Sequence, residues 1–232
     1  MTRLAYDPPI SDPAVVLVHG AWGSPGLWSD VTAFLEPAGL DVRLADLPTM
    51  SSSAASFADD VAHVRRLAGE GPVVLVGHSY GGSVIGEAAA EVEVTHLLYV
   101  ATIVLDVGES FFEWILKRDT GGAPLDFADD GTAMVTQWGD PTRDTPDAMR
   151  LYEANPPRRF AAAAAGVAVT HAPWRAVPST FVLATDDKVI HPDTQREVAG
   201  RAGRTVELDS THLVPANRPR EVAELILEAT RR

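Results

Sequence analysis

The strongest constraint on the fold is an alternation of short apolar runs with segments of helical periodicity. Runs that are apolar on both faces are typical of strands in a parallel sheet covered by helices on both sides. Between them, Ser56–Ala68 and the segment opened by Pro219 place apolar residues at helical spacing. The alternation predicts an α/β protein built from right-handed βαβ units, with a doubly wound parallel sheet. The runs rich in valine and leucine are Ala14–Val18, Val42–Leu44, Val73–Val76, Val94–Ala101, Phe181–Ala184 and Val206–Leu208.

One segment interrupts this alternation. Residues 104–178 show no clear strand–helix rhythm and hold three of the five tryptophans. A segment of this length between two strands is too long for a loop. We predict a mostly helical insertion, called the cap below, over a core formed by residues 1–103 and 179–232. Within the cap, the Ala161–Ala165 run is expected to be helical by propensity alone, in a helix that begins at Pro156-Pro157.

Composition excludes several classes of function. The 232 residues contain no cysteine, which removes disulfides, thiolate metal sites and a cysteine nucleophile. The formal charge of −13 repels phosphate backbones, so we expect no nucleic-acid partner. Neither a signal peptide nor an apolar stretch long enough to cross a membrane is visible. We therefore expect a cytoplasmic protein with no membrane partner, as a monomer or homodimer.

A serine lies where a strand is followed by a sharp turn and a helix. Val73–Val76 leads into Gly77-His78-Ser79-Tyr80-Gly81-Gly82, and Ser83–Ala90 then reads as a helix. A G-x-S-x-G turn in this context holds the serine in a strained conformation with its hydroxyl exposed. The pattern predicts Ser79 as a nucleophile and the backbone N–H of Tyr80 as a donor to an oxyanion. His78 is expected to pack beside the turn.

A second loop supplies a candidate partner donor. The first predicted strand runs into His19-Gly20-Ala21-Trp22, and the Ala21 N–H is our candidate for the other half of an oxyanion hole. We expect His19 to bond loop backbone rather than to act as a base. Trp22 either walls a substrate pocket or packs in the interior.

A serine nucleophile needs a base and an acid that orients it, and in such folds both follow the serine in the chain. Asp186 and Asp187 come directly after a predicted strand, where active sites of parallel sheets lie. Asp187 is favoured because Asp-x-Val-Ile precedes a helix-opening proline, and Asp186 remains the alternative. His212 is the predicted base, because it alone of seven histidines lies between the last strand and the final helix.

The other histidines have other expected places. His63 lies on a helix face and is expected to be solvated, whereas His96 lies in a strand run and is expected to be a hydrogen-bonded structural residue. His171, in the cap, and His191, near the aspartates, remain candidates for substrate contact.

Taken together, these motifs resemble the α/β-hydrolase superfamily over nearly the whole chain. The His19-Gly20-Ala21 start and the Gly77–Gly82 turn are similar to a branch of plant methyl esterases, hydroxynitrile lyases and small bacterial esterases of the pyrethroid-hydrolysing type. The lyases carry a lysine after the base histidine, whereas this chain has Leu213, which argues against lyase activity. The short N-terminus leaves no room for the first two strands of the eight-stranded fold, so we expect six parallel strands.

The resemblance implies a carboxylic ester hydrolase that needs no cofactor or metal. Its expected substrate is a neutral small molecule with an apolar or aromatic group. The candidate pocket residues are Trp22, Phe111, Trp114, Trp138 and Leu213, although the aromatic residues of the cap would equally serve as its own core. Two alternatives remain open: a cofactor-free perhydrolase with the same triad, and a ligand receptor built on a hydrolase fold.

Overall fold

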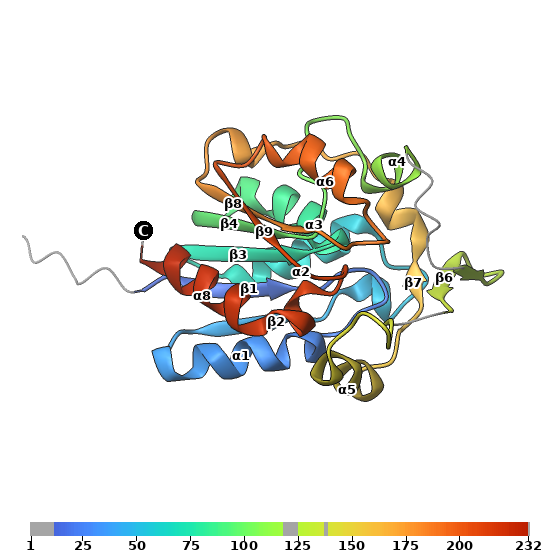
Figure 1. The fold of residues 1–232 in the computed structure, drawn as a ribbon. Helices are drawn as coiled ribbons and strands as arrows, with labels where there is room; N and C mark the ends of the chain where they lie inside the picture. The colour runs from blue at the N-terminus through green and yellow to red at the C-terminus, as the bar shows by residue number, and fades with distance from the viewer. Residues whose placement is uncertain (1–11, 118–124, 137–138, 232) are drawn as a thin grey trace, which may run out of the picture.

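The main sheet has six parallel strands in the order β2-β1-β3-β4-β8-β9 (Figure 1). The structure is a computed structural model that describes residues 12–117, 125–136 and 139–231. Each strand lies on one of the predicted apolar runs, so the predicted α/β class and six-stranded sheet are confirmed. The strands are β1 (Ala14–Val18), β2 (Val42–Ala45), β3 (Val73–His78), β4 (Val94–Val100), β8 (Ser179–Ala184) and β9 (Arg204–Leu208).

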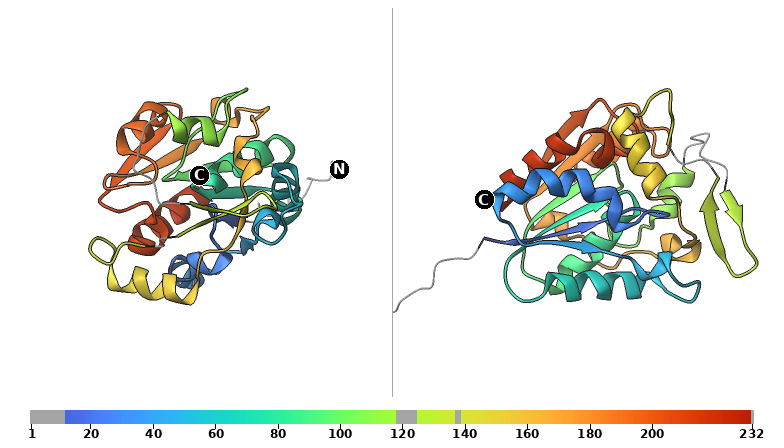
Figure 2. Two further views of the ribbon diagram at one scale, coloured as in Figure 1. Left: turned by 90° about the vertical axis from the view of Figure 1, so that its right-hand side faces the viewer. Right: turned by 90° about the horizontal axis from the view of Figure 1, so that it is seen from below.

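Helices cover both faces of this sheet (Figure 2). One face packs on α1 (Ser29–Leu35) and α8 (Pro219–Thr230), and the other packs on α2 (Phe57–Ala68), α3 (Tyr80–Ala88) and α6 (Pro192–Ala199). Successive side chains of β1 enter opposite layers, Val16 with α2 and α3 and Val15 with α1 and α8. This two-sided burial explains why β1 and most of β3 are apolar rather than alternating, whereas the edge strands β2 and β9 include charged residues.

The C-terminal ends of the parallel strands meet at one edge of the sheet, and the cap lies at that edge (Figure 1). The loop after β1 carries Ala21, the turn after β3 carries Ser79, and the loops after β8 and β9 carry Asp187 and His212. Parallel strand direction thus gathers four segments that are far apart in the sequence.

The cap differs from the mostly helical segment that we predicted. It contains α4 (Phe111–Leu116) and α5 (Pro146–Ala154), and also a three-stranded antiparallel sheet of β5 (Leu125–Phe127), β6 (Thr132–Val135) and β7 (Phe160–Ala161). The turn between β5 and β6 includes Gly131 at φ 81°, a conformation that glycine adopts readily. Short strands joined by such a turn leave little alternating pattern for sequence analysis to detect.

The prediction of a helix over Ala161–Ala165 is wrong. Pro156-Pro157 follow the end of α5 instead of opening a helix, and Phe160–Ala161 pair with β6. The remaining alanines form only a 3₁₀ turn, Ala162–Gly166. Phe160 is buried against the rings of Trp22 and Tyr80, so strand pairing and burial outweigh the helix propensity of alanine.

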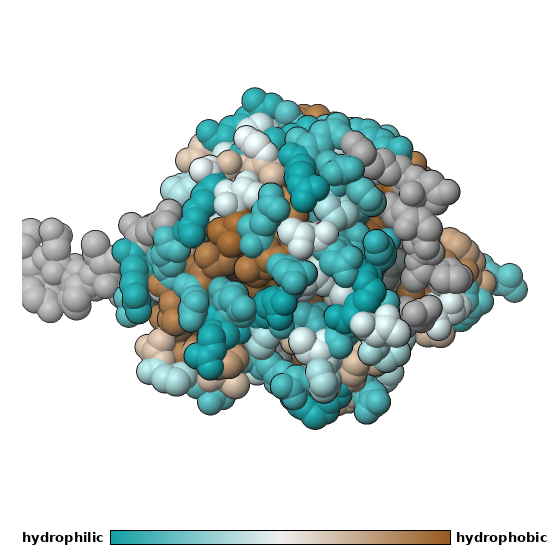
Figure 3. Space-filling model, in the orientation of Figure 1, coloured by the Kyte–Doolittle hydropathy of each residue, from teal (hydrophilic) through white to brown (hydrophobic). Residues whose placement is uncertain are grey.

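Short elements complete the chain: the helix α7 (Val214–Asn217) and 3₁₀ turns at Pro25–Trp28, Glu36–Ala38, Pro48–Met50, Ala89–Glu91 and Pro173–Arg175. The face seen in Figure 3 is largely hydrophilic, with an apolar area near its middle and smaller apolar areas elsewhere. Within the described ranges, no helix combines the length and the apolar character needed to cross a bilayer.

Candidate active site

Ser79 occupies a strained turn between β3 and α3. Its φ of 53° and ψ of −128° lie where side-chain-bearing residues are rarely found. Hydrogen bonds hold its backbone on both sides, because its N–H donates to the Val100 carbonyl at 3.0 Å and its carbonyl accepts from Thr102 Oγ1 at 2.5 Å. A Cβ on Gly77 would lie 2.5 Å from the Gly81 carbonyl oxygen, so this position requires glycine. Thr102 gave no signal in the sequence.

The Ser79 hydroxyl begins a chain of hydrogen bonds through three side chains. Ser79 Oγ lies 2.9 Å from His212 Nε2, and His212 Nδ1 lies 2.7 Å from Asp187 Oδ2. With Nδ1–H donating to the carboxylate, Nε2 is free to accept the hydroxyl proton. The structure thus brings together the three side chains that the sequence singles out, from loops that follow β3, β8 and β9.

Asp187, rather than Asp186, faces the histidine. Its buried carboxylate also accepts hydrogen bonds from the N–H groups of Val189 and Ile190, at 2.7 and 2.9 Å, and from Gln195 Nε2 at 2.8 Å. The carboxylate of Asp186 instead forms an ion pair with Arg143 of the cap. Gln195 lies on α6, where its polar side chain reads as a surface residue in sequence.

Two backbone N–H groups flank the serine. The Tyr80 amide is the first of α3, and the leading amides of a helix have no acceptor within it. The Ala21 amide donates no hydrogen bond within the described part of the chain. A Cβ on Gly20 would lie 2.7 Å from the Cβ of Ser79, which shows how closely this loop approaches the turn. Neither amide donates a hydrogen bond within the described residues, and both belong to segments that meet at Ser79.

A buried carboxylate, that of Asp60, is hydrogen-bonded to the side chain of the residue that follows Ser79. The Asp60 side chain accepts hydrogen bonds from Tyr80 Oη at 2.8 Å, Thr49 Oγ1 at 2.6 Å and the Thr49 N–H at 3.0 Å. Burial raises the pKa of the Asp60 carboxyl above its usual range, although these donors oppose the rise. Burial and the nearby Asp60 likewise raise the pKa of the Tyr80 hydroxyl. Asp60 lies on α2 and was not predicted from sequence.

His78 packs beside the turn, as expected, and also holds the loop of the candidate base. Its Nε2 lies 2.9 Å from the carbonyl oxygen of His212, and the two rings lie 4.9 Å apart. Burial, with a smaller contribution from the charge on His212, lowers the pKa of His78 to about 3. His78 is therefore neutral at physiological pH and donates from Nε2.

His19 bonds loop backbone, as predicted. Its Nδ1 lies 2.8 Å from the Gly20 carbonyl oxygen, and its Nε2 accepts from the Leu47 N–H at 3.3 Å. His96 is buried with Nε2 3.0 Å from Thr180 Oγ1, which fits its expected structural role.

His171 and His191, the two candidates for substrate contact, are hydrogen-bonded to other groups. His171 pairs with Glu87 at 2.9 Å, and His191 accepts a hydrogen bond from the Asp193 N–H at the start of α6. His63 is only partly exposed and its Nε2 is buried, which differs from the solvated side chain that we expected.

The candidate pocket residues divide into two groups. Phe111 and Trp114 are buried in the same apolar cluster as α2 and α3, where Phe111 packs edge-on against Tyr80. Trp22 directly follows Ala21, packs edge-on against Phe160 and donates from Nε1 to the Ala133 carbonyl at 3.0 Å. Trp138 lies outside the described residues.

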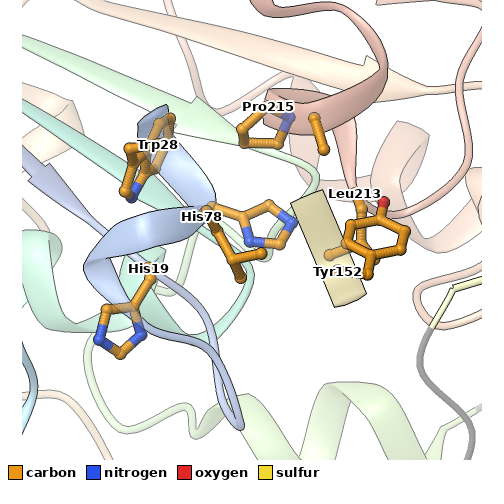
Figure 4. A pocket seen from close by; sticks show the side chains of 8 residues that line it. His19, Trp28, His78, Tyr152, Leu213 and Pro215 are labelled. Carbon is orange, nitrogen blue, oxygen red and sulfur yellow. The ribbon is translucent and has the colours of Figure 1, made fainter. Parts of the chain in front are cut away.

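Leu213 and His78 line a small cavity behind the histidine loop (Figure 4). Its volume of about 10 Å³ matches a single water molecule rather than a substrate. Its other lining residues are His19, Leu27, Trp28, Tyr152, Pro215 and Ala216. No group of three or more histidine or carboxylate side chains in the described ranges is arranged to bind a metal ion.

Comparison with known proteins agrees with this architecture. The chain matches the model of the alpha/beta hydrolase family over residues 15–225. It is 26% identical over 215 residues to the alpha/beta hydrolase nvfD of Aspergillus novofumigatus, covering 81% of this chain and 83% of that protein.

Many solved structures are similar in fold. The pyrethroid hydrolase of Sphingobium faniae JZ-2 has a TM-score of 0.74 at 20% identity, covering 94% of this chain and 97% of that one. A polyneuridine aldehyde esterase has a TM-score of 0.74 at 19% identity, covering 94% and 99%. The resemblance read from the sequence motifs is confirmed.

Proposed function

Because the chain belongs to the alpha/beta hydrolase family, whose model spans residues 15–225, we propose that it is a serine hydrolase that cleaves carboxylic esters. The observation that carries the proposal is the continuous hydrogen-bonded path from Ser79 Oγ through His212 to the buried Asp187. Such a path supplies what a serine hydroxyl lacks on its own, a base held in the correct tautomer.

In the first step, His212 Nε2 takes the hydroxyl proton as Ser79 Oγ attacks the ester carbonyl carbon. Negative charge moves to the carbonyl oxygen, where the N–H groups of Ala21 and Tyr80 stabilise it; each such donor is worth about 10²–10³ in rate. The Asp187 carboxylate stabilises the imidazolium that forms. The tetrahedral intermediate then breaks its bond to the alcohol oxygen, which receives the proton from His212.

The second step mirrors the first. The departing alcohol leaves an acyl group on Ser79, and a water molecule transfers a proton to His212 as it attacks the acyl carbon. The same two N–H groups stabilise the second oxyanion. Collapse of this intermediate returns the proton to Ser79 Oγ and releases the carboxylic acid.

For the substrate, we propose a neutral small ester with an apolar or aromatic group. A partly exposed aromatic side chain follows one of the proposed oxyanion donors, since Trp22 is next to Ala21 in the chain. The net charge of −13 disfavours anionic substrates. The names of the two similar structures, a pyrethroid hydrolase and an esterase, support ester hydrolysis.

The test is a panel of p-nitrophenyl esters of increasing acyl length and of benzoate, with the matching anilides in parallel. We expect ester hydrolysis in the wild type and a loss of at least about 10⁴-fold in kcat for Ser79→Ala. A fluorophosphonate should label Ser79 with one equivalent, detected by peptide mass. An undiminished rate in Ser79→Ala would refute the nucleophile, and cleavage of anilides without esters would refute the substrate class.

A further inference from the structure

Arg158 connects the cap to the loop that bears Ala21. It lies between α5 and β7, and its backbone N–H donates to the Trp22 carbonyl at 2.8 Å. Its side chain reaches the same loop, where Nε donates to the Gly23 carbonyl at 2.9 Å. Its Nη2 also forms an ion pair with Asp46 at 2.7 Å, just after β2. One cap residue thus bonds two consecutive carbonyls that directly follow Ala21.

The loop held in this way is strained. Trp22 has a φ of 61°, a left-handed conformation that is unfavourable for a residue with a large side chain. Further contacts with the cap stabilise this conformation: Trp22 Nε1 donates to the Ala133 carbonyl, and its ring packs edge-on against Phe160. A strained residue persists only where surrounding contacts define its conformation, and here those contacts come from the cap.

The two sides of Ala21 are held by different parts of the protein. On the N-terminal side, His19 Nδ1 bonds the Gly20 carbonyl at 2.8 Å within the core. On the C-terminal side, the carbonyls of Trp22 and Gly23 bond Arg158. The Ala21 N–H lies in one peptide plane with the Gly20 carbonyl, and that carbonyl also accepts a hydrogen bond from the Gly23 N–H at 3.3 Å. Because Arg158 bonds the carbonyls on both sides of this Gly23 N–H, releasing Arg158 loosens the bond to Gly20 and lets the Ala21 N–H turn away from Ser79.

We infer that Arg158 is a positioning residue that holds the Ala21 N–H toward the oxyanion and so couples the cap to catalysis. The inference rests on the proposed ester hydrolase function. It requires the contribution of Arg158 to be larger in the transition state than in the ground state, because charge on the substrate oxygen develops only there.

The test compares Arg158→Ala and Arg158→Lys with Arg159→Ala as a matched control. Arg159 is the next residue, but its side chain bonds Asp126 and Thr132 within the cap. Arg158→Ala removes the side-chain bonds to the Gly23 carbonyl and to Asp46 but keeps the backbone bond to the Trp22 carbonyl. We expect it to lower kcat by about tenfold with little change in KM, less than the loss of a whole donor because the Ala21 N–H remains. Arg158→Lys should recover part of the rate, and Arg159→Ala should stay near wild type.

A second measurement separates positioning from general damage. A trifluoromethyl ketone, which forms an oxyanion on Ser79, should bind Arg158→Ala more weakly in proportion to the lost kcat, whereas an uncharged amide analogue should bind unchanged. Equal losses for both ligands, or equal kcat in the Arg158 and Arg159 variants, would overturn the inference. If Arg158→Ala does not fold, Arg158→Lys decides by the same ligand comparison. Wild-type and Ser79→Ala rates test the proposed function separately.

Discussion

Replacing His78 by glutamine should make the free energy of unfolding less sensitive to mild acidification. In the folded chain, burial holds the pKa of His78 at about 3, and its Nε2 bonds the His212 carbonyl. In the unfolded chain, the imidazole is solvated and its pKa is about 6.5. Between these values the unfolded state binds a proton that the folded state does not. This stabilising contribution is therefore full above the unfolded pKa and is lost as the pH falls below it.

The size of the effect follows from the two pKa values. At pH 5.5 the folded His78 is still neutral, whereas the unfolded population is favoured about 11-fold by protonation. This ratio corresponds to about 1–2 kcal/mol of unfolding free energy lost between pH 7.5 and pH 5.5. Glutamine has no charge to gain, and its side-chain amide can still donate to the His212 carbonyl, so the variant should lack this loss.

Urea unfolding of the wild type and His78→Gln at pH 7.5 and 5.5 measures the difference directly. Both pH values lie above the isoelectric point of about 4.8, where solubility would fall. Titrating groups that do not interact with His78 contribute equally to both proteins and cancel in the comparison. His191→Gln, at an exposed position, is the matched control for the substitution itself. An identical fall in the wild type and His78→Gln would refute the reasoning.

Two further predictions concern buried carboxylates. Asp187→Asn should lower kcat by up to about 10⁴-fold, because an amide no longer holds the base imidazole in the productive tautomer. Asp186→Asn should change kcat less than tenfold. Steady-state ester hydrolysis measures both variants, and equal losses would contradict the assignment. Tyr80→Phe removes one of the hydrogen-bond donors to buried Asp60 and should lower the unfolding free energy by about 1–3 kcal/mol. Because the backbone N–H of residue 80 remains, kcat should stay within tenfold of the wild type. Unchanged stability in urea would show that the hydrogen bond contributes nothing.

The choice between two adjacent aspartates shows where sequence reasoning reaches its limit. The chain order and the strand end place a carboxylate in this loop, but neighbouring side chains in a turn point in different directions. Asp187 turns inward because Val189, Ile190 and Gln195 donate to it, whereas Asp186 turns outward to Arg143. Those donors come from the backbone of the turn and from α6, and neither leaves a sequence signal.

The cap shows the same limit on a larger scale. Its strand β6 pairs with β7 some 25 residues further along the chain, and that pairing decides the structure of Phe160–Ala161. Local propensity favoured a helix there, because alanine is a strong helix former. Burial of Phe160 against Trp22 and Tyr80 is a tertiary contact, which a local pattern does not contain.

The sequence alone determined the α/β class, the six strands and the candidates Ser79 and His212, because buried strands require continuous apolar runs and the turn requires its glycines. Only the tertiary structure decided which aspartate faces His212, how the cap folds, and which buried groups hold the site. Asp60, Gln195 and Arg158 are single polar residues on helices or loops. Their roles arise from neighbours distant in the chain, and a hydrogen bond across the fold follows from how the elements pack rather than from any local pattern.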